Sequence, residues 1–132
     1  MPESLIITEP AAGTTPVPPR PRAARLAVLI PCYNEEVAIP GVVRGFRAAL
    51  PGAAIHVYDN NSRDGTRAAA AAAGAVVRTE PLQGKGNVVR RMFADIEADV
   101  YVLVDGDGTY EAAAAPGMVR LLLDERLDMV TG

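Results

Sequence analysis

Short apolar runs alternate with longer amphipathic segments from residue 25 to the end of the chain. The runs predict strands, and the segments, which carry apolar residues at helical spacing, predict helices. The predicted strands are residues 26–30, 54–58, 75–78, 100–104 and 128–131. The predicted helices are residues 37–50, 66–73 and 116–126, and a stretch that the sequence PLQGKGN opens and that reaches about residue 98.

This alternation is typical of an α/β fold, in which right-handed crossovers build a mostly parallel sheet. The runs at 26–30 (LAVLI) and 100–104 (VYVLV) are apolar throughout instead of alternating with polar residues. Strands covered on both sides show this pattern. We therefore expect helices on both faces of the sheet.

Residues 1–24 differ from the rest in composition, with six prolines among small and polar residues. Such a stretch buries too little apolar surface to offset the entropy of ordering, which predicts a flexible Pro-rich tail. A proline-rich ligand segment is the alternative, but no clean basic-flanked PxxP repeat supports it. The domain is expected over residues 25–132.

Composition excludes several classes of protein. The net charge of −3 indicates no general attraction to nucleic acid or to anionic membranes. A single cysteine, Cys32, excludes an internal disulfide and a cysteine-based zinc cluster. The N-terminus lacks the basic start and long apolar run of a signal peptide, and no run approaches the ~20 apolar residues of a membrane span. A cytoplasmic location is expected.

Polar motifs follow three of the predicted strands: PCYNEE after the first, DNNSRDG after the second and DGDGTY after the fourth. Ligands of open parallel sheets bind beyond the carboxyl ends of the strands. The three motifs are therefore expected to converge on one cleft, with the loop QGKGN as a neighbour.

The DGD motif offers two carboxylates, Asp105 and Asp107, with no lysine or arginine close by in the sequence. Such a pair suits a hard divalent cation that takes its other ligands from water and a phosphate. A plain surface turn is the alternative, since Asp and Gly favour turns. An EF-hand is excluded because Tyr110 and Pro116 stand where its loop requires Gly and Glu.

The other motifs also allow two interpretations each. Asp59, Asn60 and Asn61 could bind a nucleobase or ribose, or could form a hydrogen-bonded turn before a helix. Lys85, next to a predicted helix start, suits a phosphate or is a solvated surface lysine. We interpret His56 as structural and Cys32 as a small buried side chain.

In this order, PCYNEE, DNNSRDGT, GKGN and VDGDGTY make residues 25–132 similar to the family 2 glycosyltransferases of the GT-A fold. The likeness is strongest to enzymes that transfer a sugar from a nucleotide donor to a polyprenyl phosphate, such as dolichyl-phosphate mannose synthases. The resemblance implies a GT-A (Rossmann-like) sheet, a UDP- or GDP-sugar donor, Mg²⁺ or Mn²⁺, and inversion at the anomeric carbon.

The resemblance also implies roles for individual residues. Asp105 and Asp107 match the metal-binding DxD signature, so a bound metal and diphosphate would supply their positive partner. Asn60 stands where many members carry aspartate, which leaves the base preference open. The residues expected to bind the nucleotide-sugar are Pro31, Tyr33, Asn34, Glu35, Asp59, Asn60, Asn61, Lys85, Asp105, Gly106 and Asp107.

No motif supplies the general base that an inverting transfer uses, and relatives carry it, with the acceptor site and any membrane helices, beyond the fifth strand. We therefore interpret the chain as the donor-binding part of an incomplete GT-A domain, whose longer parent associates with the cytoplasmic face of the membrane. Self-association through an incomplete sheet or core face is a further expectation. A binding module without activity is the alternative. A Rossmann dehydrogenase, a sugar nucleotidyltransferase and a P-loop protein are disfavoured because their phosphate-binding loops are absent from the sequence.

Overall fold

The computed structural model describes residues 5–9, 24–125 and 128–131. Its elements are β1 (Leu5–Thr8), β2 (Leu26–Cys32), α1 (Ile39–Ala49), β3 (Ala54–Asp59), α2 (Thr66–Ala72), β4 (Val76–Thr79), α3 (Lys85–Asp95), β5 (Val100–Val104), the 3-10 helix η1 (Ala112–Ala114), α4 (Ala115–Asp124) and β6 (Met129–Thr131).

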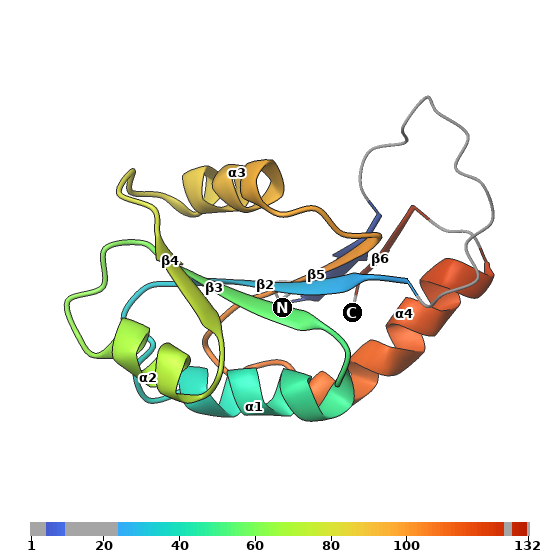
Figure 1. Cartoon of the computed structure of the whole chain (residues 1–132), viewed down its shortest axis with the longest axis horizontal. Coiled ribbons are helices and arrows are strands. Elements are labelled where there is room, and N and C mark those ends of the chain that lie inside the picture. Colours follow the sequence, from blue (N-terminus) through green and yellow to red (C-terminus); the bar gives the residue numbers. More distant parts are fainter. Residues whose placement is uncertain (1–4, 10–23, 126–127, 132) are drawn as a thin grey trace.

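The strands form one six-stranded sheet in the order β4-β3-β2-β5-β1-β6. The pairs β4–β3, β3–β2 and β2–β5 are parallel, whereas β1 is antiparallel to both β5 and β6. As Figure 1 shows, α1, α2 and α4 cover one face of the sheet and α3 covers the other. The predictions of an α/β fold, a mostly parallel sheet and helices on both faces are confirmed.

Two apolar cores correspond to these two faces. The larger lies between the sheet and α1, α2 and α4, and includes the fully buried Phe46 and Leu122. The smaller lies under α3, where Val88 and Met92 pack against Leu29 and Tyr101. Burial on both sides of β2 explains why its sequence is continuously apolar.

Strand β1 differs from the expectation of a flexible tail over residues 1–24. Leu5–Thr8 pairs with β5, and the side chains of Leu5 and Ile7 are fully buried. The prediction is therefore wrong for these four residues, because pairing on both sides and burial offset the entropy of ordering them. The other proline-rich residues, 1–4 and 10–23, lie outside the described residues.

Element boundaries differ from the predicted ones by up to three residues. Helix α1 begins at Ile39 instead of residue 37. Pro40 lies in the first turn of the helix, a position that proline favours. Helix α3 ends at Asp95 instead of about residue 98, because Ile96 is already extended. Within the described residues, none of the helices has the length and apolar character needed to cross a bilayer.

Candidate functional site

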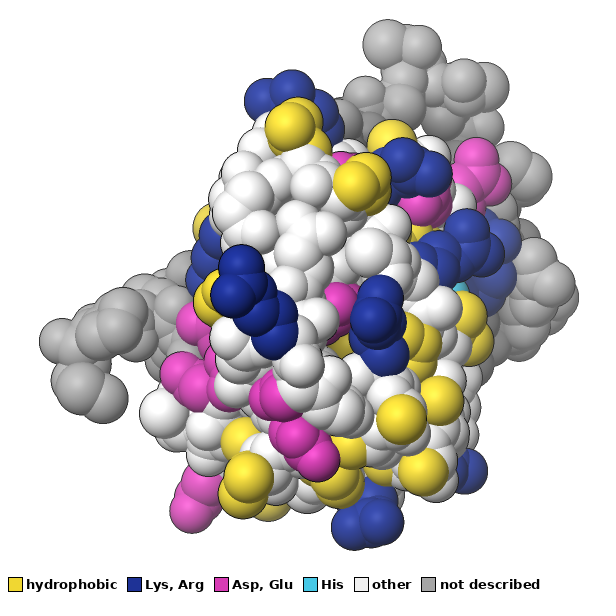
Figure 2. Space-filling model, turned by 90° about the vertical axis from the view of Figure 1, so that its left-hand side faces the viewer, with side chains coloured by type: hydrophobic (Ala, Val, Ile, Leu, Met, Phe, Trp, Pro, Cys, Tyr) yellow, Lys and Arg dark blue, Asp and Glu magenta, His cyan; other side chains and the backbone are white. Residues whose placement is uncertain are grey.

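A pocket of about 250 Å³ lies at the edge of the sheet where the parallel strands end. Figure 2 faces this edge and shows acidic and basic side chains interspersed over it. The pocket is lined by Pro31, Cys32, Tyr33, Glu35, Asn60, Gln83, Gly84, Lys85, Val88, Asp105, Gly106 and Asp107. Segments from all four sequence motifs thus meet at one place, as the strand order predicts.

Hydrogen bonds join the loops that follow β2 and β3. The backbone N–H of Asn34 donates to Ser62 Oγ over 2.8 Å, and that of Glu35 donates to Thr66 Oγ1 over 2.9 Å. In the opposite direction, the N–H of Arg63 donates to Asn34 Oδ1 over 2.9 Å. The side chain of Asn34 therefore holds the two loops together and is not among the residues that line the pocket.

Asp59 lies behind the pocket wall. Its side chain is fully buried, and its Oδ2 accepts a hydrogen bond from the N–H of Ser62 over 3.0 Å and lies 3.9 Å from Arg67 Nε. Its Oδ1 has no hydrogen-bond partner among the described residues. Asp59 and Asn61 are absent from the pocket lining, as is Asn34. The structure thus places eight of the eleven expected residues around the pocket and these three outside it.

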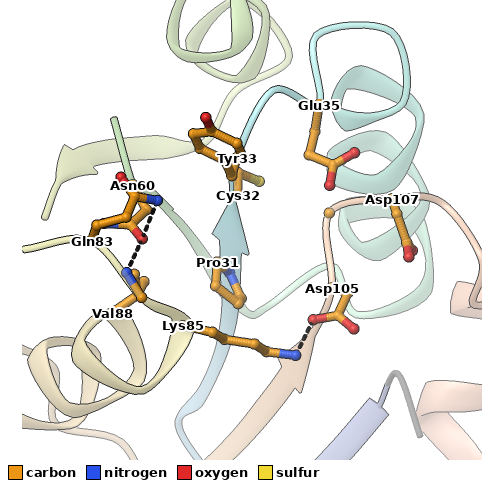
Figure 3. Close-up of a pocket in the computed structure, with 12 residues that line it drawn as sticks. Pro31, Cys32, Tyr33, Glu35, Asn60, Gln83, Lys85, Val88, Asp105 and Asp107 are labelled. Atoms are coloured by element: carbon orange, nitrogen blue, oxygen red, sulfur yellow. Dashed lines mark hydrogen bonds and ion pairs between the residues drawn. The ribbon is translucent and has the colours of Figure 1, made fainter. Parts of the chain in front are cut away.

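The acidic end of the pocket is formed by Glu35, Asp105 and Asp107 (Figure 3). Burial raises the pKa of Glu35, and the charges of Asp107 and Asp105 raise it further. Each carboxylate therefore sits in the negative potential of the others, which favours a cation between them. Asp107 is oriented by its own loop, because its Oδ1 accepts hydrogen bonds from the N–H and hydroxyl of Thr109 over 3.0 and 2.8 Å.

Lys85 provides a positive charge beside these carboxylates, a contact that the sequence does not predict. Its Nζ lies 2.5 Å from Asp105 Oδ1. Asp105 therefore has a positive partner within the protein, in addition to the metal and diphosphate expected from the sequence. The ion pair between Lys85 and Asp105 is not apparent from the sequence because the two residues are 20 positions apart.

Two aspartates, with Glu35 nearby, suit Mg²⁺ or Mn²⁺ if a bound substrate supplies some of the metal's ligands. The described residues contain no group of three or more His, Cys, Asp or Glu side chains arranged to hold an ion alone. Magnesium usually binds through one or two carboxylates and completes its shell with water and phosphate oxygens. The residues present therefore fit an ion that enters together with a phosphate-bearing ligand.

Gly106 allows the two aspartates to approach β2 closely. A Cβ atom at this position would collide with Cys32 Sγ. Cys32 is buried, and burial is the main cause of the raised pKa of its thiol. A thiol held protonated is a poor nucleophile, so Cys32 acts as part of the pocket floor.

The N-terminus of α3 forms the remaining wall. Gly84, with φ of 127°, precedes the helix, and Gln83, Lys85 and Val88 line the pocket beside it. Backbone N–H groups at such a helix end favour anions. The sequence predicts Lys85 as a site residue but not Cys32, Gln83, Gly84 and Val88, although the position of QGKGN before a helix is a signal for Gln83 and Gly84.

Two hollows elsewhere are larger, at about 590 and 410 Å³. The first lies at the opposite ends of the strands, around Arg25, His56 and Glu97, and the second lies between α1 and residues 107–112. Neither combines acidic, basic and amide groups from several motif loops. Its chemistry, and not its size, therefore makes the pocket at the strand ends the candidate functional site.

The fold and this site define an α/β protein with a charged pocket at the carboxyl ends of its parallel strands, and comparison with known proteins identifies its family. The family model described as "Glycosyl transferase family 2" matches residues 27–132, so the chain belongs to glycosyltransferase family 2. Protein RfbJ of Shigella flexneri is 55% identical over 107 residues, which cover 81% of this chain and 83% of RfbJ. An uncharacterized glycosyltransferase of Mycobacterium bovis, Mb0553, is 38% identical over 108 residues.

Among solved structures, glucosyl-3-phosphoglycerate synthase of Mycobacterium tuberculosis in complex with Mn²⁺, UDP and phosphoglyceric acid is similar, with a TM-score of 0.69 and 28% identity. The match covers 76% of this chain and 39% of the synthase. The match to Mb0553 likewise covers 81% of this chain and 47% of the relative. The chain thus spans less than half of these two relatives, although it spans most of RfbJ.

Proposed function

We propose that this chain binds the donor of a glycosyl transfer, a UDP- or GDP-linked sugar, and that the transfer is metal-dependent and inverts the anomeric carbon. The observation that carries the proposal is the division of one pocket into two chemically different ends. Amide groups from Asn60 and Gln83 lie at one end, and Asp105, Asp107 and Lys85 lie at the other. A nucleotide-sugar has the same polarity, with a base at one end and a charged diphosphate at the other.

At the diphosphate end, Asp105 and Asp107 would hold Mg²⁺ or Mn²⁺, which offsets diphosphate charge and so stabilises the leaving group. Lys85 and the N-terminal N–H groups of α3 would bind phosphate oxygens. Binding of Mn²⁺ and UDP by the similar mycobacterial synthase supports this assignment.

We propose a polyprenyl phosphate as acceptor. The order and identity of the four motifs support it, and a phosphate that is already ionised makes little demand on a general base. Phosphoglyceric acid in the similar synthase also carries a phosphate. Because the chain spans less than half of two relatives, binding of the donor without transfer is the competing function.

One assay separates transfer from binding alone. The protein is incubated with Mg²⁺ or Mn²⁺, labelled UDP- and GDP-sugars and a short polyprenyl phosphate, and glycosyl-lipid is extracted and counted. We expect labelled lipid that disappears when EDTA is added. Donor binding without any labelled lipid would support the binding module instead.

Replacing Asp107 tests the metal site separately. Asp107→Asn retains an oxygen that can accept the hydrogen bonds from Thr109, and Asp107→Ala does not. Both variants should fold, because a loop carboxylate contributes little to the core, and both should reduce UDP or GDP affinity in Mn²⁺ at least about tenfold. Calorimetry with and without Mn²⁺ measures this, with Asp124→Ala on α4 as a control of equal charge. Unchanged affinity in both variants would refute the role of Asp107.

A further inference from the structure

The side chain of Asn60 is fully occupied by the protein itself. Its Nδ2 donates to the carbonyl oxygens of Glu80 and Leu82 over 2.8 and 3.0 Å. Its Oδ1 accepts from the N–H of Gly84 over 2.8 Å and from Gln83 Nε2 over 3.1 Å. A primary amide offers two donors and two acceptor lone pairs, so Asn60 has no hydrogen-bonding capacity left for a ligand.

The orientation of this amide follows from its partners. A backbone N–H can only donate and a carbonyl oxygen can only accept, so the amide of Asn60 cannot be reversed. An aspartate here would direct a carboxylate oxygen at the carbonyls of Glu80 and Leu82, which is repulsive. Asparagine at this position therefore serves the loop of residues 80–84, which leads into α3.

The neighbouring Asp59 does not reach the ligand either. It is fully buried, and one of its oxygens is bonded to the N–H of Ser62. Asn60 thus has no free donor or acceptor, and Asp59, although its Oδ1 has no partner among the described residues, is fully buried and absent from the pocket lining. The side chain that recognises the base must therefore lie elsewhere at this end of the pocket.

Gln83 meets the requirement. Its Nε2 donates to Asn60 Oδ1, and its Oε1 accepts from Asn61 Nδ2 over 3.0 Å. Asn61 Nδ2 also donates to the carbonyl of Pro81, which confirms the direction of the network. Two of the four hydrogen-bonding positions of the Gln83 amide are therefore used, and one N–H and one lone pair remain on an exposed residue that lines the pocket.

We infer that Gln83 is the residue that reads the base of the bound nucleotide, and that Asn60 and Asn61 hold its amide in place. This inference rests on the proposed function. One free donor beside one free acceptor complements a base edge on which an N–H adjoins a carbonyl, as in the imide of uracil and the lactam of guanine. Tyr33, 49% exposed, lies at the same end of the pocket, where its ring can pack against the base (Figure 3).

The test compares wild-type protein with Gln83→Leu by calorimetry in Mn²⁺, using UDP, GDP and inorganic pyrophosphate. Leucine removes the amide but leaves Asn60 bonded to Gly84 and Asn61 bonded to Pro81, so the loop should persist. We expect the affinity for the preferred nucleotide to fall about tenfold, as two neutral hydrogen bonds would allow, and the affinity for pyrophosphate to stay unchanged.

An equal loss for nucleotide and pyrophosphate, or no loss for either, would overturn the inference. Asn60→Asp provides the second arm, because a loop that no longer holds the Gln83 amide should weaken UDP and GDP at least as much as pyrophosphate. If Asn60→Asp weakened UDP or GDP while Gln83→Leu changed neither, the base-reading role would belong to Asn60 and the inference would be overturned. A wild-type protein that binds none of the probes would overturn the proposed function itself, whereas normal wild-type binding with an unaffected Gln83→Leu variant overturns only the assignment of Gln83.

Discussion

Removing the lysine that faces the aspartates should affect the metal and the nucleotide in opposite directions. Lys85 Nζ lies 2.5 Å from Asp105 Oδ1, with the two side chains 59% and 29% exposed. A pair this exposed contributes about 0.2–1 kcal/mol. Lys85→Met should therefore release Asp105 and strengthen the binding of Mn²⁺ alone by up to about fivefold.

The same substitution removes a charged donor from the diphosphate. A hydrogen bond to a charged group contributes about 1.5–3 kcal/mol, so UDP or GDP in saturating Mn²⁺ should bind about 10- to 150-fold more weakly. Calorimetric titration of Mn²⁺ alone, and then of nucleotide, measures both effects. Arg90→Met, at an exposed position of the same helix, removes an equal charge and should change neither. If Lys85→Met weakened both ligands, or neither, the ion pair would not be a competitor of the metal.

Three further substitutions test the fold around the site. The hydrogen bond from the Tyr58 hydroxyl lowers the pKa of Asp95 below its ordinary value of 3.8, so the charged carboxylate stabilises the fold near pH 7. Asp95→Asn should therefore lower the Tm near pH 7, and the difference in Tm from wild type should shrink as the pH falls through the depressed pKa. A deficit that persists in acid would contradict this. Gly106→Ala should cost about 1–3 kcal/mol of unfolding free energy in urea, and Cys32→Ala should recover part of it in a double-mutant cycle; additive losses would exclude the collision. Phe46→Ala should cost about 3–5 kcal/mol in the same assay, and a loss below about 1 kcal/mol would mean that Phe46 is not central to the larger core.

The parallel part of the sheet can be predicted from the sequence because burial on both faces leaves a local signal. The run at 26–30 is apolar without interruption and becomes the buried core of β2, and residues 100–104 form β5 as expected. Once the strands are placed in parallel, the convergence of the motifs that follow them is a geometric consequence.

Strand β1 could not be found in this way. The four residues of Leu5–Thr8 are too few to show a period, and they stand beside a proline-rich stretch. Their order depends on pairing with β5, almost a hundred residues later in the chain. Tertiary partners of this kind leave no pattern in a short segment.

The roles of the individual polar residues also cannot be predicted from the local sequence. Whether an amide reads a ligand or supports a loop depends on which groups use its donors and acceptors. For Asn60 these groups lie 20 to 24 positions away, in the loop before α3. The sequence indicates that such residues gather at the site, and only the hydrogen-bond partners indicate which of them are free.

The position of β1 matters for anyone who expresses this protein in shortened form. The segment that matches the family begins at residue 27, so a clone cut at that boundary would discard Leu5–Thr8. In the described sheet this strand separates β5, which leads to Asp105, from β6. Its loss would expose the edge of the aspartate-bearing strand and detach β6 from its neighbour. An inactive clone of that kind would report a broken sheet and would say nothing about the chemistry of the pocket.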